Sequence, residues 1–360
     1  MKQVFRERFD INIMLQFHKA LKIMRKYPSR LPFYVRVAAN QMRAARLREK
    51  QHEHGIEVPP LLIISITRRC NLNCRGCYSR ELHLDKAEEL TPERMRIILT
   101  EARDLGVSIV LLAGGEPLIK KGILDVAADF PELIFPVFTN GLLIDEDYAG
   151  FFGKNPHLIP VISLEGGQAE TDFRRGSGVY QNFSSVIKLL NKEKVFWGIS
   201  LTLTSQNLDD VLTEDYAREL LGKGCRLFFY VEYVPVSAGS EELVLSEIQK
   251  AGVQGRVDKL MENLPGLFVA FPGDEDQYEG CLAAGRGFLH INPQGRAEPC
   301  PFAPFSDTDL RSESLAEALR SPVLSAIREQ HHLLKEGRGG CALWANREEV
   351  QRIIATGADS

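Results

Sequence analysis

Short apolar runs alternate with amphipathic stretches through the middle of the chain. Six runs rich in branched apolar residues predict strands, at Leu61–Thr67, Ser108–Ala113, Phe135–Thr139, Leu158–Leu164, Val195–Thr204 and Arg226–Val234. Amphipathic stretches of helical length lie between them, at Thr91–Leu105, Leu118–Asp129, Gly178–Lys192 and Asp209–Gly222. Strands separated by helices pair in parallel through right-handed crossovers. The pattern therefore predicts an α/β fold whose parallel sheet is either open or curved into a barrel.

Helical patterns flank this alternating region. Residues 10–52 predict two helices, separated by a break from Pro28 to Pro32. The apolar positions of the first are Met14, Phe17, Leu21 and Met24, and the second covers Tyr34–Arg48. The polar segment His52–Pro60 follows as a linker. From Ser237 to Asp276 the pattern is polar and helical, and after Gly280 it is irregular and contains three cysteines.

We therefore expect four regions along the chain. They are an N-terminal basic helical arm (residues 1–58), a barrel core (59–236), a helical connector (237–279) and a cysteine-containing C-terminal region (280–360). The predicted strands begin only after the linker, and the arm is rich in charged residues. We accordingly expect the barrel to fold without the arm.

Charge is unevenly distributed. Residues 1–52 carry 13 Lys/Arg against three Asp/Glu, or +10, whereas the remainder carries 31 against 45, or −14. The charges of the basic arm are most simply interpreted as a solvated helix face. As alternatives, the arm could dock on an acidic patch of this chain, on an acidic partner or on a membrane surface. No nucleic acid is expected, because no binding motif accompanies the charge. No apolar run reaches about 18 residues and the N-terminus lacks a signal pattern, so we expect a cytoplasmic protein.

Three of the seven cysteines form a CxxxCxxC pattern just after the first predicted strand. Cys70, Cys74 and Cys77 lie within eight residues. Cytosolic thiols stay reduced, so clustered cysteines favour metal binding over disulfides. Three thiolates can hold an iron–sulfur cubane and leave one iron open to a substrate or cofactor. The alternatives are buried structural thiols or a zinc site, although zinc generally needs four ligands and His83 is the only nearby candidate.

These residues resemble a known family. The cysteine loop followed by Tyr78, together with Gly114-Gly115-Glu116-Pro117 at the end of the second predicted strand, resembles the radical S-adenosylmethionine (radical SAM) superfamily. The resemblance covers roughly residues 61–235. It implies a partial (β/α)6 TIM-like barrel in which the open iron of a [4Fe–4S] cluster binds S-adenosylmethionine. One electron, from a reducing flavodoxin or ferredoxin, would then cleave the cofactor to a 5′-deoxyadenosyl radical that abstracts hydrogen from the substrate.

The resemblance also implies roles for individual residues. The glycines of the motif would let the backbone approach the cofactor, and Glu116 with nearby carbonyls would receive its ammonium group. Ser163 and Arg175 would orient its carboxylate and ribose, and many family members carry Asp where this chain has Glu165. The cofactor-binding set expected in this way is Tyr78, Gly114, Gly115, Glu116, Pro117, Asn140, Ser163, Glu165 and Arg175.

A second cysteine group lies near the C-terminus. Cys281, Cys300 and Cys341, with a predicted strand and turn at Phe288–Gly295, resemble the twitch and SPASM auxiliary-cluster extensions of the same superfamily. The resemblance implies one auxiliary [4Fe–4S] cluster, with an iron not held by cysteine unless a side chain such as His290 or Asp307 closes it. The alternative is three isolated core cysteines, as we expect for Cys225.

The function that follows is radical modification of a peptide or protein side chain, or of a small cofactor precursor, because auxiliary-cluster relatives do such work. Glu232 and Tyr230 share one face of the sixth predicted strand and are candidate catalytic residues. Glu232 either faces the substrate cavity or lies at a solvated edge. Two other functions remain as alternatives: a non-catalytic iron–sulfur electron carrier or sensor on the same fold, and a zinc-stabilised binding protein.

Overall fold

The computed structural model describes residues 11, 13–21, 23, 31–271, 280–335 and 341–357. In this part of the chain one sheet contains the strands β1 (Leu61–Ser65), β2 (Ile109–Ala113), β3 (Phe135–Thr139), β4 (Leu158–Leu164), β5 (Gly198–Leu203), β6 (Leu227–Glu232), β7 (Leu267–Phe271), β8 (Phe288–Ile291) and β9 (Ala297–Glu298). Their order is β7-β6-β5-β4-β3-β2-β1-β8-β9. Neighbouring strands are parallel except β8 and β9, which form an antiparallel hairpin.

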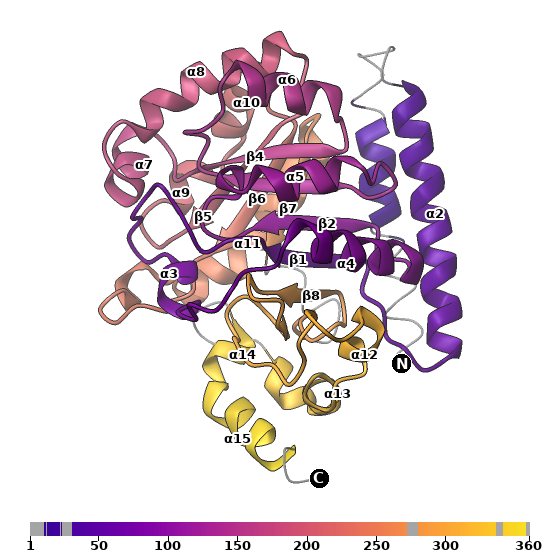
Figure 1. The fold of residues 1–360 in the computed structure, drawn as a ribbon. Coiled ribbons are helices and arrows are strands. Elements are labelled where there is room, and N and C mark those ends of the chain that lie inside the picture. Colours follow the sequence, from indigo (N-terminus) through magenta and orange to yellow (C-terminus); the bar gives the residue numbers. More distant parts are fainter. Residues whose placement is uncertain are drawn as a thin grey trace.

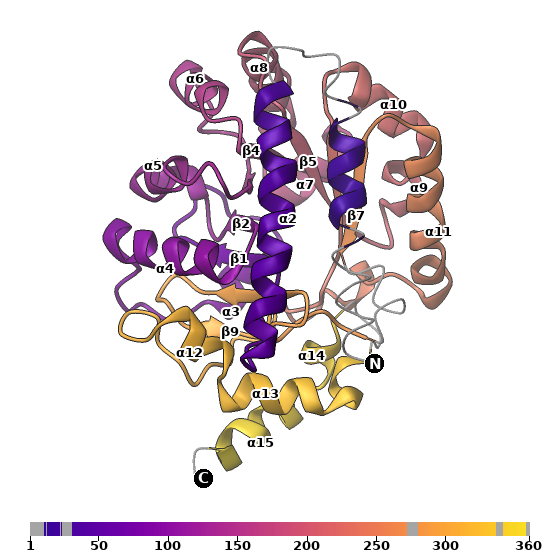
Figure 2. The same cartoon turned by 90° about the vertical axis from the view of Figure 1, so that its right-hand side faces the viewer.

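Helices surround the strands in an arc, so the sheet is curved (Figure 2). The helices are α2 (Leu31–Glu53), α3 (Tyr78–Leu82), α4 (Pro92–Leu105), α5 (Lys121–Ala128), α6 (Glu146–Lys154), α7 (Gln168–Arg175), α8 (Val179–Lys192), α9 (Leu208–Val211), α10 (Glu214–Gly222), α11 (Glu247–Asn263), α12 (Leu315–Leu319), α13 (Pro322–Glu329), α14 (Ala342–Ala345) and α15 (Arg347–Gly357). Short 3₁₀ turns occur at Pro117–Ile119, Glu241–Leu243 and His331–Leu334. This arrangement confirms the predicted partial TIM-like barrel.

The first long outer helix shows how local chemistry sets these boundaries. Thr91 caps α4 by accepting a hydrogen bond from the Arg94 amide, and Pro92 occupies the first turn, where its missing N–H costs nothing. Gly106 ends the helix with a φ of 105°, in the left-handed region that favours glycine. Met95, Ile98, Leu99 and Ala102 form its buried face.

All six predicted runs contain strands, but two features of the sheet differ from expectation. β7 lies in the segment 237–276, which was expected to be helical throughout. The helix α11 confirms that expectation for its first part, but the five-residue strand that follows was not predicted. β8 was expected as part of a separate C-terminal hairpin. It pairs in parallel with β1, with Leu61 opposite Phe288, and so extends the barrel sheet as well as forming the hairpin.

The N-terminal helices close the end of the barrel opposite the cysteine loop. Figure 1 shows α2 beside the amino ends of the strands, while α3 and α7 lie at their carboxyl ends. Leu21 and Phe33 pack against a cluster of buried residues made up of Val161, Phe196 and Leu227. Between these helices and the strands is a largely apolar cavity of about 540 Å³. Met24 and the break expected at Pro28 lie outside the described residues.

This packing changes the expectation for the arm. Deleting residues 1–50 would expose apolar side chains on the strands, and each fully buried side chain of this kind contributes about 1.5–3 kcal/mol. We therefore expect the deletion to lower the stability of the barrel by several kcal/mol, measured by thermal or denaturant unfolding. Replacing the exposed Arg43 and Arg46 by Gln is the control, because it removes charge and keeps the apolar face. Equal stability of the deletion variant and the full chain would contradict the expectation.

None of the described helices combines the length and the apolar character needed to cross a membrane.

Candidate active site

The loop after β1 brings three thiols together. Cys70 is exposed, and Cys74 and Cys77 are half-buried. Burial raises the pKa of Cys70, and the negative charges of the two other cysteines raise it further. Burial also raises the pKa of Cys74, but the nearby guanidinium groups of Arg175 and Arg174 oppose that effect. Three neighbouring thiols can supply the thiolate ligands of an iron–sulfur cluster, and the two arginines favour the ionised form of Cys74.

A tyrosine that the sequence did not single out packs against this loop. Gly76 has a φ of 62°, and a Cβ atom there would lie 2.3 Å from the Tyr233 hydroxyl. Tyr233 follows β6 directly, and its hydroxyl is buried with no hydrogen-bond partner among the described residues. Both the backbone conformation and this contact require glycine between Cys74 and Cys77. The only sequence signal for Tyr233 was its position just beyond a strand that points toward the cysteine loop.

The glycine motif packs against the backbone of the cysteine loop. A Cβ atom would lie 2.3 Å from the Thr67 carbonyl oxygen at Gly114, and 2.1 Å from the Arg69 carbonyl oxygen at Gly115. The amide of Gly115 donates to Thr67 at 2.6 Å, and the amide of Glu116 donates to Arg69 at 2.8 Å. From the sequence, both glycines were expected to let the backbone approach a cofactor. The structure shows a second requirement for glycine: a side chain at Gly115 would displace the backbone that leads into Cys70.

The carboxylate of Glu116 joins the ends of two strands. It is buried and accepts hydrogen bonds from the Thr139 hydroxyl at 2.7 Å, the Asn140 amide at 2.8 Å and the Leu118 amide at 3.1 Å. Burial raises the pKa of Glu116, and these bonds oppose the increase. The Asn140 side chain in turn donates to Asn71 at 2.7 Å. Glu116 and Asn140 thus hold the cysteine loop from the side of β3, while Pro117 starts the following 3₁₀ turn.

Two arginines share one buried glutamate beside the cysteine loop. Glu165 follows β4, and its Oε1 lies 2.5 Å from Arg174 and 2.6 Å from Arg175, both at the end of α7. The Arg75 amide donates to the Arg174 carbonyl at 2.9 Å, which ties the cysteine loop to the same helix. One carboxylate cannot neutralise two guanidinium groups, so Glu165, Arg174 and Arg175 together carry a net positive charge, which the nearby carboxylate of Glu116 partly offsets. The second oxygen of Glu165, Oε2, is buried with no hydrogen-bond partner among the described residues.

The cofactor-binding set predicted from the sequence includes Arg175 but not Arg174. Adjacent positions on a helix do not indicate that both side chains reach one carboxylate. Ser163 lies half-buried in β4, near the end of the strand that leads to Glu165. Asp172, on the same helix as the two arginines, stabilises the start of α8: its carboxylate accepts from the amides of Gly178 at 3.1 Å and Tyr180 at 3.0 Å.

Tyr78 connects the cysteine loop with the C-terminal region. Its ring packs against Phe302, with ring centroids 5.0 Å apart, and against His83 at 5.9 Å. Burial raises the pKa of Tyr78, the charges of Cys77 and Cys300 raise it further, and a hydrogen bond from Ser65 opposes the increase. The tyrosine therefore lies between the first cysteine group and the second.

The second cysteine group is assembled by the fold. Cys281, Cys300 and Cys341 are all buried. Burial raises the pKa of Cys300 well above its usual value, and a hydrogen bond with Cys341 and the charges of Cys341 and Cys281 raise it further. Three thiols from distant parts of the chain are thus neighbours. Cys225 stands apart, and burial raises its pKa to about 12.

The two non-cysteine residues considered for this group have other partners. Asp307 accepts from the Ser321 hydroxyl at 2.5 Å and the Val323 amide at 3.2 Å, at the start of α13. His290 lies within hydrogen-bond distance of Ser65 and Glu298.

The candidate catalytic residues of β6 face away from the barrel interior. Phe229 contacts Phe138 of β3, with ring centroids 5.0 Å apart, although two strands separate β3 from β6. Such a contact is possible only across the concave side of the sheet. Side chains alternate along a strand, so Tyr230 lies on the opposite, helix-covered side, where it is fully buried. The same alternation places Glu232 with Tyr230.

Comparisons with known proteins agree with this geometry. A family model described as "Radical SAM superfamily" matches residues 64–216. The chain is 25% identical over 312 residues to an AdoMet-dependent heme synthase of Methanosarcina barkeri, which spans 79% of this chain and 88% of that protein. It is 25% identical over 256 residues to a PqqA peptide cyclase of Granulibacter bethesdensis, with 68% of each chain covered. The fold is similar to Streptococcus suis SuiB bound to its precursor peptide SuiA, with a TM-score of 0.62, 19% identity and coverage of 81% and 72%.

Proposed function

The chain belongs to the radical SAM superfamily, whose members are enzymes, and from this premise we propose that Cys70, Cys74 and Cys77 hold a [4Fe–4S] cluster at which S-adenosylmethionine is cleaved. The observation that carries the proposal is the excess positive charge of Arg174 and Arg175 beside these three thiols. A plain electron carrier has no need of an anion site next to its cluster.

The residues present fit both the cluster and the cofactor. Three thiolates leave one iron of a cubane without a protein ligand. The excess guanidinium charge suits a carboxylate, for which arginine provides paired donors. The buried and unpartnered Oε2 of Glu165 is an acceptor that suits a ribose hydroxyl. The methionine part of the cofactor carries such a carboxylate, and the ribose part carries such hydroxyls.

The roles of the chain's own residues follow from their contacts. When bound and reduced, the cluster supplies the electron that breaks a sulfonium bond of the cofactor. Glu116 and Asn140 keep the cysteine loop in place through the hydrogen bonds described above. Phe138 and Phe229 form part of an apolar interior that helps to exclude water from a radical. An external flavodoxin or ferredoxin is our proposed source of the electron.

We propose a peptide side chain or a small cofactor precursor as the substrate. The relatives by sequence include a heme synthase and a peptide cyclase, and SuiB binds a precursor peptide. The C-terminal cysteines support an auxiliary [4Fe–4S] cluster, since all three are neighbours and buried. Asp307 and His290 are engaged elsewhere, so we propose that one iron of this cluster has no ligand from this group of side chains.

Anaerobic cleavage of the cofactor tests the proposal. Protein reconstituted with iron and sulfide and reduced with dithionite should convert S-adenosylmethionine to 5′-deoxyadenosine and methionine without any added substrate. Chromatography of both products measures the reaction, and unreduced protein is the control. A reconstituted protein with intact cluster spectra that forms no 5′-deoxyadenosine would instead support the non-catalytic electron carrier.

A further inference from the structure

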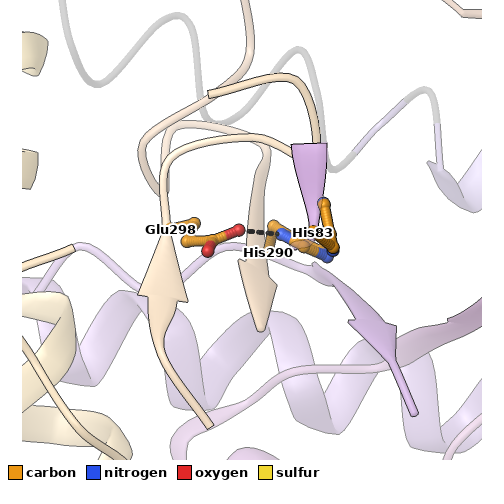
Figure 3. Close-up of side chains that lie close together, drawn as sticks. All are labelled: His83, His290 and Glu298. Atoms are coloured by element: carbon orange, nitrogen blue, oxygen red, sulfur yellow. Dashed lines mark hydrogen bonds and ion pairs between the residues drawn. The ribbon is translucent and has the colours of Figure 1, made fainter. Parts of the chain in front are cut away.

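A buried cluster of polar side chains is formed by segments that neighbour the two cysteine groups in the sequence, and it is not part of the proposed cofactor site. It consists of His83, at the end of α3, and of His290 and Glu298, which face each other across the β8–β9 hairpin. One donor atom from each of the three lies within 4.8 Å of the other two, and all three residues are buried. Figure 3 shows the three side chains together, with His290 between the other two.

The hydrogen bonds of His83 show which of its ring nitrogens can bind a cation. His83 Nε2 lies 3.2 Å from the Pro301 carbonyl oxygen. A carbonyl can only accept, so Nε2 carries the hydrogen and Nδ1 retains its lone pair. That Nδ1 is buried and has no hydrogen-bond partner among the described residues.

Hydrogen bonds also hold the side chains of His290 and Glu298 in place. His290 Nε2 is 2.9 Å from the Ser65 hydroxyl, while its Nδ1 is 2.7 Å from Glu298 Oε2. The second oxygen of Glu298, Oε1, accepts from the Asn292 side chain at 2.6 Å. Metal-binding histidines and carboxylates are usually held by such outer partners. Burial lowers the pKa of both imidazoles and raises that of Glu298 to about 7, and a cation bound at this point would favour the neutral imidazoles and the ionised carboxylate.

We propose that His83, His290 and Glu298 form a binding site for one divalent transition-metal ion, distinct from both cysteine groups. Two imidazoles and a carboxylate suit zinc and ferrous iron. Ligands about 2.1 Å from one tetrahedral ion lie about 3.4 Å apart, so donors that are now up to 4.8 Å apart would move together by about 1.4 Å at most. The ion would compensate the buried carboxylate and supply the missing partner of His83 Nδ1.

The position of the site gives it a structural role. His83 follows the first cysteine loop by six residues, and Glu298 precedes Cys300 by two. An ion held by both segments would fix the loop of the first cluster against the hairpin that carries a cysteine of the second. It is therefore expected to stabilise the fold and the spacing of the two cysteine groups.

Zinc is the probe for the test. Full-length protein reconstituted with iron and sulfide is dialysed against a chelator, then given one equivalent of Zn²⁺ and desalted. We expect about one zinc per chain, with X-ray absorption showing nitrogen and oxygen neighbours near 2.0–2.1 Å and no sulfur near 2.3 Å. Zinc should also raise the thermal unfolding midpoint.

Two variants make the test specific. His83→Gln keeps a donor for the Pro301 carbonyl and removes Nδ1, and should weaken zinc binding at least tenfold. His157→Gln is the matched control, because His157 is also buried and its Nε2 also lies near a backbone carbonyl, that of Ala127 at 3.3 Å. It should bind zinc like the wild type.

Zinc retention no higher than in His83→Gln, equal loss in the two variants, or sulfur neighbours would each overturn the proposal. The absorption spectrum of the wild type decides the matter even if a variant misfolds. None of these measurements uses cofactor cleavage, so failure here is separate from failure of the proposed function.

Discussion

Replacing Cys70, Cys74 and Cys77 together by alanine is expected to abolish formation of 5′-deoxyadenosine. Without these thiolates the cluster that binds the cofactor is lost, so activity should fall to the level of the protein-free control. Iron content should fall from about eight to about four per chain if the auxiliary cluster is present. Chromatographic product analysis and iron determination measure the two effects.

Cys225→Ala is the control for this variant. Cys225 is fully buried and away from both cysteine groups, so its replacement tests the loss of a buried thiol without loss of a ligand. It should retain both iron and cleavage. Cleavage at the wild-type rate by the triple variant would contradict the central proposal, because no other described site could then account for the reaction.

Replacing Cys281, Cys300 and Cys341 by alanine should remove about four irons and leave cleavage of the cofactor intact. Turnover of the natural substrate should be lost if the auxiliary cluster binds the substrate or accepts an electron from it. Mössbauer and EPR spectra of the wild type and the variant measure the clusters directly.

Loss of three buried thiols can also destabilise the fold, so the variant needs its own control. Retained cleavage of S-adenosylmethionine shows that the barrel and the first cluster are intact. Equal iron in wild type and variant would mean that the C-terminal cysteines are structural and that the enzyme has a single cluster.

Local features of the sequence predicted much of the barrel. The runs Phe135–Thr139 and Leu158–Leu164 match β3 and β4 residue for residue, because β-branched and aromatic residues bounded by turns identify buried strands. The strand β7 was not predicted, because it lies in the connector (residues 237–279), whose pattern is mainly polar and helical. A strand of five residues beside a long helical pattern has too few positions for its periodicity to be distinct.

The roles of individual site residues were less accessible. Gly115 was predicted to let the backbone approach the cofactor, but its closest neighbour is the Arg69 carbonyl, a contact that depends on the path of another segment. Tyr230 appeared as a candidate catalytic residue because it shares a strand face with Glu232. Only the curvature of the sheet reveals that this face is covered by helices.

By itself the sequence indicated the chemistry that the chain can support, because the CxxxCxxC spacing and the glycine motif each lie within a few consecutive residues and are recognisable without the fold. The tertiary structure alone decided which distant groups meet. It gathers Cys281, Cys300 and Cys341, places Arg174 and Arg175 on one carboxylate, joins β8 to β1 and brings His83 to the β8–β9 hairpin. Backbone hydrogen bonds between strands are the same for almost every residue type, so pairing partners are selected by the packing of the whole chain rather than by local residue pattern.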